Sequence, residues 1–140
     1  MADAGETGLG ATRAGVRRYV ATNDRGGELV IGYDEGEFSP GDLLKLAVLG
    51  CNLLSGEARF DAALGEVTPL SGTIDATYDQ AENRFTDFLV KIGADLSSLD
   101  EAETKMLLTR AKKAIDRRCT ISHTVAQGAP TKQEVDGIPL

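Results

Sequence analysis

Hydrophobic and polar positions change their spacing several times along the chain, and each change predicts a different element. Residues 16–22 and 28–33 are rich in β-branched and aromatic side chains, and the turn residues around Arg25 separate them. This pattern predicts a β-hairpin. Residues 73–78 alternate apolar with polar side chains, and residues 84–92 return after a polar turn with apolar side chains on one face. They predict a second hairpin.

A long helix is predicted between the two hairpins. Ser39 can cap its first amides, Pro40 suits the first helical position, and Asp42 completes a capping box. Residues 43–51 are apolar on nearly every face, so this helix must be covered by its surroundings, which in a small chain indicates a partner subunit. Residues 57–64 either continue the helix or form a second one.

A further helix is predicted to begin with a capping box of Ser98 and Glu101 and to end near Arg118. Acidic residues crowd its start and basic residues its end, an order that the helix dipole favours without any ligand. Its apolar spacing places Cys119 on the buried face, and residues 131–136 are predicted to form a closing strand. Hairpins separated by helices predict an α+β fold with antiparallel sheets.

Composition limits the classes of function. A chain of 140 residues with 41% hydrophobic content is expected to form one domain over residues 13–140, after a flexible tail at residues 1–12. The net charge of −7 argues against nucleic acid or an anionic membrane as a partner. The start of the chain lacks the pattern of a signal peptide and no apolar run has transmembrane length, so a reducing cytoplasm is the expected location.

The two cysteines, Cys51 and Cys119, are the candidates for chemistry. A persistent structural disulfide is unusual in the cytoplasm, and the spacing does not fit a zinc site, so no metal is expected. If the fold brings the thiols together, the chain is a thiol-redox protein; if it does not, both are core residues of a structural α+β domain. His123, the single histidine, is either a surface group or a residue that tunes Cys119.

Taken together, these segments resemble the OsmC/Ohr family of osmotically inducible and organic-hydroperoxide-resistance proteins. The matching segments are residues 39–44, the apolar helix that leads to Cys51, and residues 119–122. The resemblance implies an OsmC-like intertwined homodimer with buried central helices. It also implies that a cysteine pair reduces organic hydroperoxides, with no bound cofactor and with an external dithiol, for example of the lipoyl type, as the reductant.

The resemblance assigns a role to each candidate residue. Cys51 would be the thiol that attacks the peroxide, and Cys119 the thiol that resolves the resulting sulfenic acid into a disulfide. Arg25 matches the family's arginine, whose guanidinium would hold the Cys51 thiolate and hydrogen-bond the peroxide. Asp42 is the carboxylate nearest to the family's glutamate position and would pair with Arg25.

Three positions depart from the family pattern. Gly41 stands where members usually carry the glutamate, Asn52 replaces a common aromatic residue, and Thr120 replaces a proline. The missing glutamate leaves a second hypothesis open: an OsmC-like dimer without peroxidase turnover, which binds a small apolar ligand or acts in a stress response.

Overall fold

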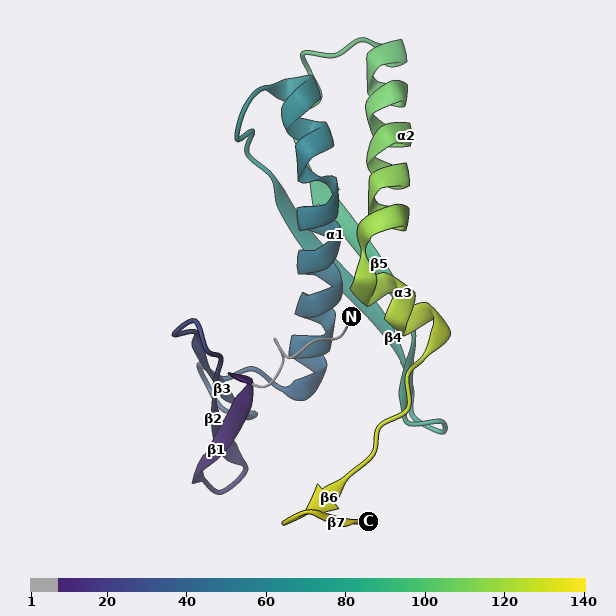
Figure 1. The fold of residues 1–140 in the computed structure, drawn as a ribbon. Coiled ribbons are helices and arrows are strands. Elements are labelled where there is room, and N and C mark those ends of the chain that lie inside the picture. The colour runs from purple at the N-terminus through teal and green to yellow at the C-terminus, as the bar shows by residue number, and fades with distance from the viewer. Residues whose placement is uncertain (1–7) are drawn as a thin grey trace. The chain divides into compact units, whose positions relative to one another are not determined.

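The structure is a computed structural model that describes residues 8–140 of the chain (Figure 1). The chain divides into two compact units, Met1–Leu46 and Ala47–Leu140, and each is described by itself. Part of the tail predicted for residues 1–12 lies outside the described residues. The prediction of a single domain over residues 13–140 stays a prediction.

Three antiparallel strands form the sheet of the first unit in the order β1-β2-β3: β1 (Gly10–Gly15), β2 (Arg18–Thr22) and β3 (Glu28–Ile31). The predicted hairpin is β2 and β3, in which Val20 pairs with Val30. Strand β1 was not predicted, and residues 10–12 belong to it rather than to a tail. Its glycine- and alanine-rich sequence has no alternation, so backbone pairing with β2 defines this strand, not its side chains.

One continuous helix, α1 (Pro40–Leu64), follows. The predicted capping box is present: Ser39 N donates to Asp42 Oδ2 at 2.9 Å, and Asp42 N donates to Ser39 Oγ at 3.1 Å. The helix ends where Gly65 takes a φ of 116°, a conformation that glycine tolerates best.

The second hairpin is formed by β4 (Ser71–Asp79) and β5 (Arg84–Gly93), which pair antiparallel. Helix α2 (Glu101–Arg118) has its N-cap at Asp100, not at Ser98 as predicted. Asp100 and Glu103 form the capping box, because the carboxylate of Asp100 accepts from Glu103 N at 2.8 Å. Helix α3 (Thr120–Gln127) comes next. The predicted closing strand is a short hairpin of β6 (Glu134–Val135) and β7 (Ile138–Pro139).

The core of the second unit lies where α1, α2 and the β4–β5 hairpin meet, and Figure 1 shows the two helices side by side in front of the hairpin. Phe60 of α1 packs there against Leu107 and Ala111 of α2. At Gly56 the helices approach closely: a Cβ at this position would lie 3.3 Å from Ile115 Cδ1. The fold is α+β with antiparallel sheets, as the sequence predicted.

Helix α1 keeps an uncovered apolar surface within the single chain. Val48, Leu49 and Phe60 are buried, whereas Leu54 is 72% exposed. The prediction of a helix covered on all sides is therefore met only in part by the chain itself. Across residues 8–140, none of the helices combines the length and the apolar character needed to cross a membrane.

Candidate functional site

The two cysteines lie in the second unit and differ in exposure. Cys51 is half-buried on α1, and Cys119 is completely buried. Cys119 stands at the junction of two helices, as the C-cap of α2 and the N-cap of α3. Both thiols are free in the structure. The fold thus leaves Cys51 partly exposed and shields Cys119 from solvent.

A polar cluster surrounds the sulfur of Cys119. The side-chain amide of Asn52 on α1 donates to Cys119 Sγ at 3.4 Å and to Ser122 Oγ at 3.0 Å. On α3, Ser122 N donates to the sulfur at 3.4 Å, and the Ser122 hydroxyl lies 3.1 Å from it. Cys51, Asn52, Cys119 and Ser122 are named the cysteine cluster below.

The hydrogen bonds of the cysteine cluster change the pKa of Cys119. Burial raises the pKa of the Cys119 thiol, but hydrogen bonds from Cys51, Ser122 and Asn52 to its sulfur together outweigh burial and lower the pKa below its ordinary value. Asn52, the residue after Cys51 on α1, donates to the same sulfur, so the two cysteines lie beside one another in the cluster. The surroundings of Cys119 therefore favour its thiolate more than water does.

A groove of about 680 Å³ lies beside the cysteine cluster. Asn52 and Ser122 form part of its wall. Much of the remaining wall is apolar and comes from α1, β5 and α3: Val48, Phe85, Phe88, Val90, Ile92 and Val125. Such a lining suits the carbon skeleton of an organic molecule.

The two other predicted site residues lie in the first unit. Arg25 is exposed in the β2–β3 turn, with Nη1 at 3.5 Å from Asp24 Oδ1. Asp42 is engaged by its capping box with Ser39, which lowers the pKa of its carboxyl, and lies 4.0 Å from Lys45 Nζ. Among residues 8–140 no ion pair joins Arg25 to Asp42, and the roles of both stay predictions.

His123 is exposed, and its ring Nε2 contacts the backbone oxygen of Asp116 rather than the thiol of Cys119. Its backbone N–H donates to Cys119 O at 3.1 Å within α3. In the described part of the chain, no group of three or more histidine, cysteine or acidic residues could hold a metal ion.

Two members of the cysteine cluster, Asn52 and Ser122, were missed as functional residues from the sequence. Signals for both were present. Asn52 follows Cys51 directly and interrupts the apolar run of residues 46–54, where a polar side chain needs a partner. Ser122 lies three residues after Cys119, which is the spacing at which an N-cap side chain meets the first turn of its helix.

Comparison with known sequences gives a consistent picture. The family model described as OsmC-like protein matches residues 32–134. Uncharacterised proteins of Mycobacterium tuberculosis and Mycobacterium bovis are each 29% identical to this chain over 131 residues, which cover 92% of this chain and 96% of the relative.

Solved structures share the fold at low sequence identity. A candidate osmotic stress induced and detoxification response protein from Psychrobacter arcticus matches with a TM-score of 0.66 and 17% identity, over 89% of this chain and 91% of that one. An OsmC like protein from Mycoplasma pneumoniae matches with a TM-score of 0.62 and 14% identity, over 86% of each chain. A candidate redox protein from Lactobacillus casei matches with a TM-score of 0.51 and 17% identity, over 84% and 82%.

Proposed function

Since the chain belongs to the OsmC-like protein family, we propose that it is a thiol-dependent peroxidase that reduces organic hydroperoxides. The observation that carries this proposal is that both cysteines belong to one hydrogen-bonded cluster, Cys51 partly exposed and Cys119 buried with a lowered pKa. The name of the Lactobacillus casei protein, which describes a redox function, agrees with it.

The first step is attack of the Cys51 thiolate on the peroxide. Cys51 first gives its proton to solvent, with Cys119 beside it as a thiol. The Cys51 sulfur then attacks one oxygen of the hydroperoxide, the O–O bond breaks, and the alkoxide takes a proton from water and leaves as the alcohol. Cys51 is oxidised to a sulfenic acid.

The second step forms the disulfide. The Cys119 sulfur attacks the sulfenic sulfur of Cys51, and the hydroxyl group leaves with the proton on Cys119 as water. An external dithiol then reduces the disulfide, becoming a cyclic disulfide itself and returning both cysteines to thiols. The sum is one hydroperoxide and one dithiol consumed for each alcohol and water produced. No bound cofactor takes part.

Substrate binding is assigned to the apolar groove beside Asn52 and Ser122. Arg25 remains the proposed cationic partner of the Cys51 thiolate. Asp42 remains the carboxylate proposed to pair with Arg25. Members of the family typically form dimers, and exposed apolar residues on α1 such as Leu54 supply a surface that a second copy would cover. We place this homodimer in the cytoplasm, where dithiol reductants keep cysteines reduced.

The test follows consumption of cumene hydroperoxide by the purified chain with a dithiol as reductant. Turnover should disappear in Cys51→Ser, whereas Cys119→Ser should give one oxidation per chain, trapped as a sulfenic acid, and then stall. Absence of hydroperoxide consumption by the unaltered protein would sink the peroxidase proposal. If both thiols also stayed free after titration with peroxide, as counted by a thiol reagent, the non-catalytic ligand-binding dimer would be the better description.

A further inference from the structure

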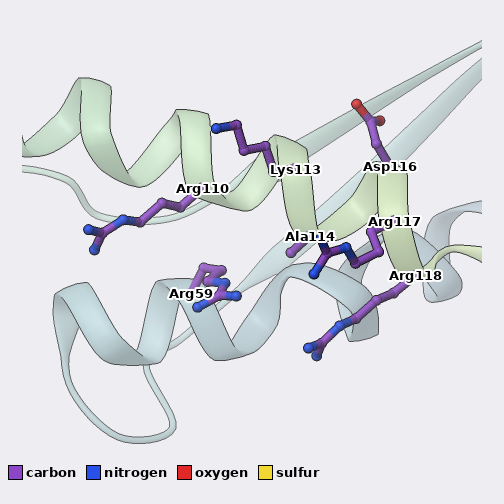
Figure 2. Close-up of a pocket in the computed structure, with 7 residues that line it drawn as sticks. All are labelled: Arg59, Arg110, Lys113, Ala114, Asp116, Arg117 and Arg118. Atoms are coloured by element: carbon purple, nitrogen blue, oxygen red, sulfur yellow. The ribbon is translucent and has the colours of Figure 1, made fainter.

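Helices α1 and α2 enclose a second groove, of about 830 Å³, that is lined mainly by cations. Figure 2 shows Arg59 on α1 opposite three arginines of α2, while Asp116 extends to the other side of α2. Lys113 also contributes to the lining. The four arginines that define this arginine groove are Arg59, Arg110, Arg117 and Arg118.

Carboxylates neutralise many basic side chains elsewhere in this acidic chain, but not these four. Arg18, Arg84 and Lys91, for example, each form an ion pair with a nearby acid. Within residues 8–140, none of the four arginines takes part in an ion pair. Asp116, the acidic residue that contributes to the lining, is itself engaged by Lys112. The groove therefore keeps an uncompensated positive charge in a protein whose net charge is −7.

The helix dipole accounts for only part of this arrangement. Arg117 and Arg118 belong to the last turn of α2, where cations are favoured. Arg110 lies two turns earlier, beyond the reach of that effect. Arg59 belongs to the neighbouring helix, whose last turn contains no basic residue. The tertiary structure, and not the dipole of one helix, therefore brings the arginines of α1 and α2 to the same groove.

We propose that the arginine groove binds an anion built of linked phosphates. A guanidinium presents two parallel N–H donors, which match the oxygens of a phosphate group. Arg110 and Arg117 are seven residues apart on one helix, which separates their backbones by about 10 Å along the axis. A row of that length exceeds one phosphate group and suits two or three in a chain. At physiological ionic strength the charge of distant acids is screened, so the local cations determine attraction.

This proposal is independent of the peroxidase chemistry, since none of the four arginines belongs to the cysteine cluster or lines its apolar groove. The ligand is either free inorganic polyphosphate or the phosphate chain of a nucleotide. Both ligands present the same chain of linked phosphate groups to the arginines.

The experiment is calorimetric titration of the full-length chain with sodium tripolyphosphate in one arm and with ATP, without divalent cations, in the other. The test variant is Arg59→Gln combined with Arg117→Gln. The matched control is Arg84→Gln combined with Lys132→Gln, which removes the same two charges outside the groove. Thermal unfolding of each variant confirms that it folds, and the single variants Arg59→Gln and Arg117→Gln replace any double variant that does not.

The expected result is saturable binding that the groove variant weakens by about tenfold or more and that the control leaves within about twofold. Comparable affinity in both arms would identify the phosphate chain as the determinant, and tighter binding of ATP would identify a nucleotide. No saturable binding to the unaltered chain in either arm, or equal loss in the control, would overturn the proposal.

Discussion

The cysteine cluster and the arginine groove are both built on helices α1 and α2, but their polar groups differ: those of the cluster are hydrogen-bonded, and the arginines of the groove are not ion-paired. In the cysteine cluster each polar side chain has a partner, and Asn52 alone donates to the backbone of Val48, to Cys119 and to Ser122. In the arginine groove the four arginines are exposed, and none of them forms an ion pair with a carboxylate of residues 8–140. A satisfied, partly buried network shifts the pKa of one sulfur, whereas unpaired charge on a surface is available to a ligand.

The largest effect is expected at Cys51. Cys51→Ser removes the sulfur that meets the peroxide and should abolish hydroperoxide turnover, because a serine hydroxyl is far less nucleophilic than a thiolate. Phosphate binding in the arginine groove should be unchanged. Measuring both activities on the same preparation separates the two regions, and a joint loss would show that they are one site.

Gly56 offers a way to disturb both regions together. Gly56→Leu places a side chain where Ile115 already lies at 3.3 Å from a Cβ, and such overpacking costs about 1–3 kcal/mol. The free energy of unfolding, from denaturant titration, should fall by that amount. Peroxidase activity and phosphate affinity should both fall, since α1 and α2 build both regions. Glu57→Leu, on an exposed neighbouring position of α1, is the control and should leave all three values nearly unchanged.

Asn52→Leu should act on the cysteine cluster alone. It removes one donor to the Cys119 sulfur, so the pKa of Cys119 should rise and the pH profile of the first oxidation step should move to higher pH. Ser122→Ala, which removes the hydroxyl but keeps the backbone donor, should give a larger shift in the same direction. Ultraviolet absorbance of the thiolate, followed against pH, measures both. A Cys119 pKa that both substitutions left unchanged would contradict the assigned network.

The same substitution has a consequence for stability. Because the folded chain holds the Cys119 thiolate more strongly than the unfolded chain does, this contribution is complete above the ordinary thiol pKa and is lost as pH falls through the lower folded pKa. The difference in unfolding free energy between the unaltered protein and Asn52→Leu should therefore grow as pH rises toward the ordinary thiol pKa.

The smallest effect is expected for the arginine groove without ligand. Arg59→Gln relieves repulsion among exposed cations and should change the free energy of unfolding by less than about 0.5 kcal/mol. Thermal unfolding measures this change. A destabilisation of several kcal/mol would mean that Arg59 has a structural partner and is not held for a ligand.

The sequence predicted the elements whose side chains define them and missed those that the backbone defines. Ser39 and Asp42 predicted the start of α1 because a capping box is local chemistry. Strand β1 was not predicted because it is defined by main-chain pairing with β2, which leaves no pattern in its side chains. The N-cap of α2 was placed at Ser98 instead of Asp100, since both residues suit the role and only the path of the chain decides.

For the candidate site, the sequence identified the two cysteines, and the tertiary structure showed which residues surround them. The periodicity predicted that Cys119 is buried, and it is. The end of α2 near Arg118 was also predicted, but the helix α3 that follows was not, nor the role of the Cys119 sulfur as the acceptor for its first turn. The lowered pKa of Cys119 depends in part on Asn52 and Ser122, which come from opposite halves of the chain and meet only in the tertiary structure.

The position of Cys119 between α2 and α3 links a redox change to the order of a helix. In the reduced chain its sulfur receives the N–H of Ser122 and closes the first turn of α3, a helix with no buried residue of its own. A sulfur bonded covalently to Cys51 is a poorer acceptor, so oxidation would loosen this turn. Amide hydrogen exchange along α3 would then report the oxidation state of the protein without any added dye or substrate.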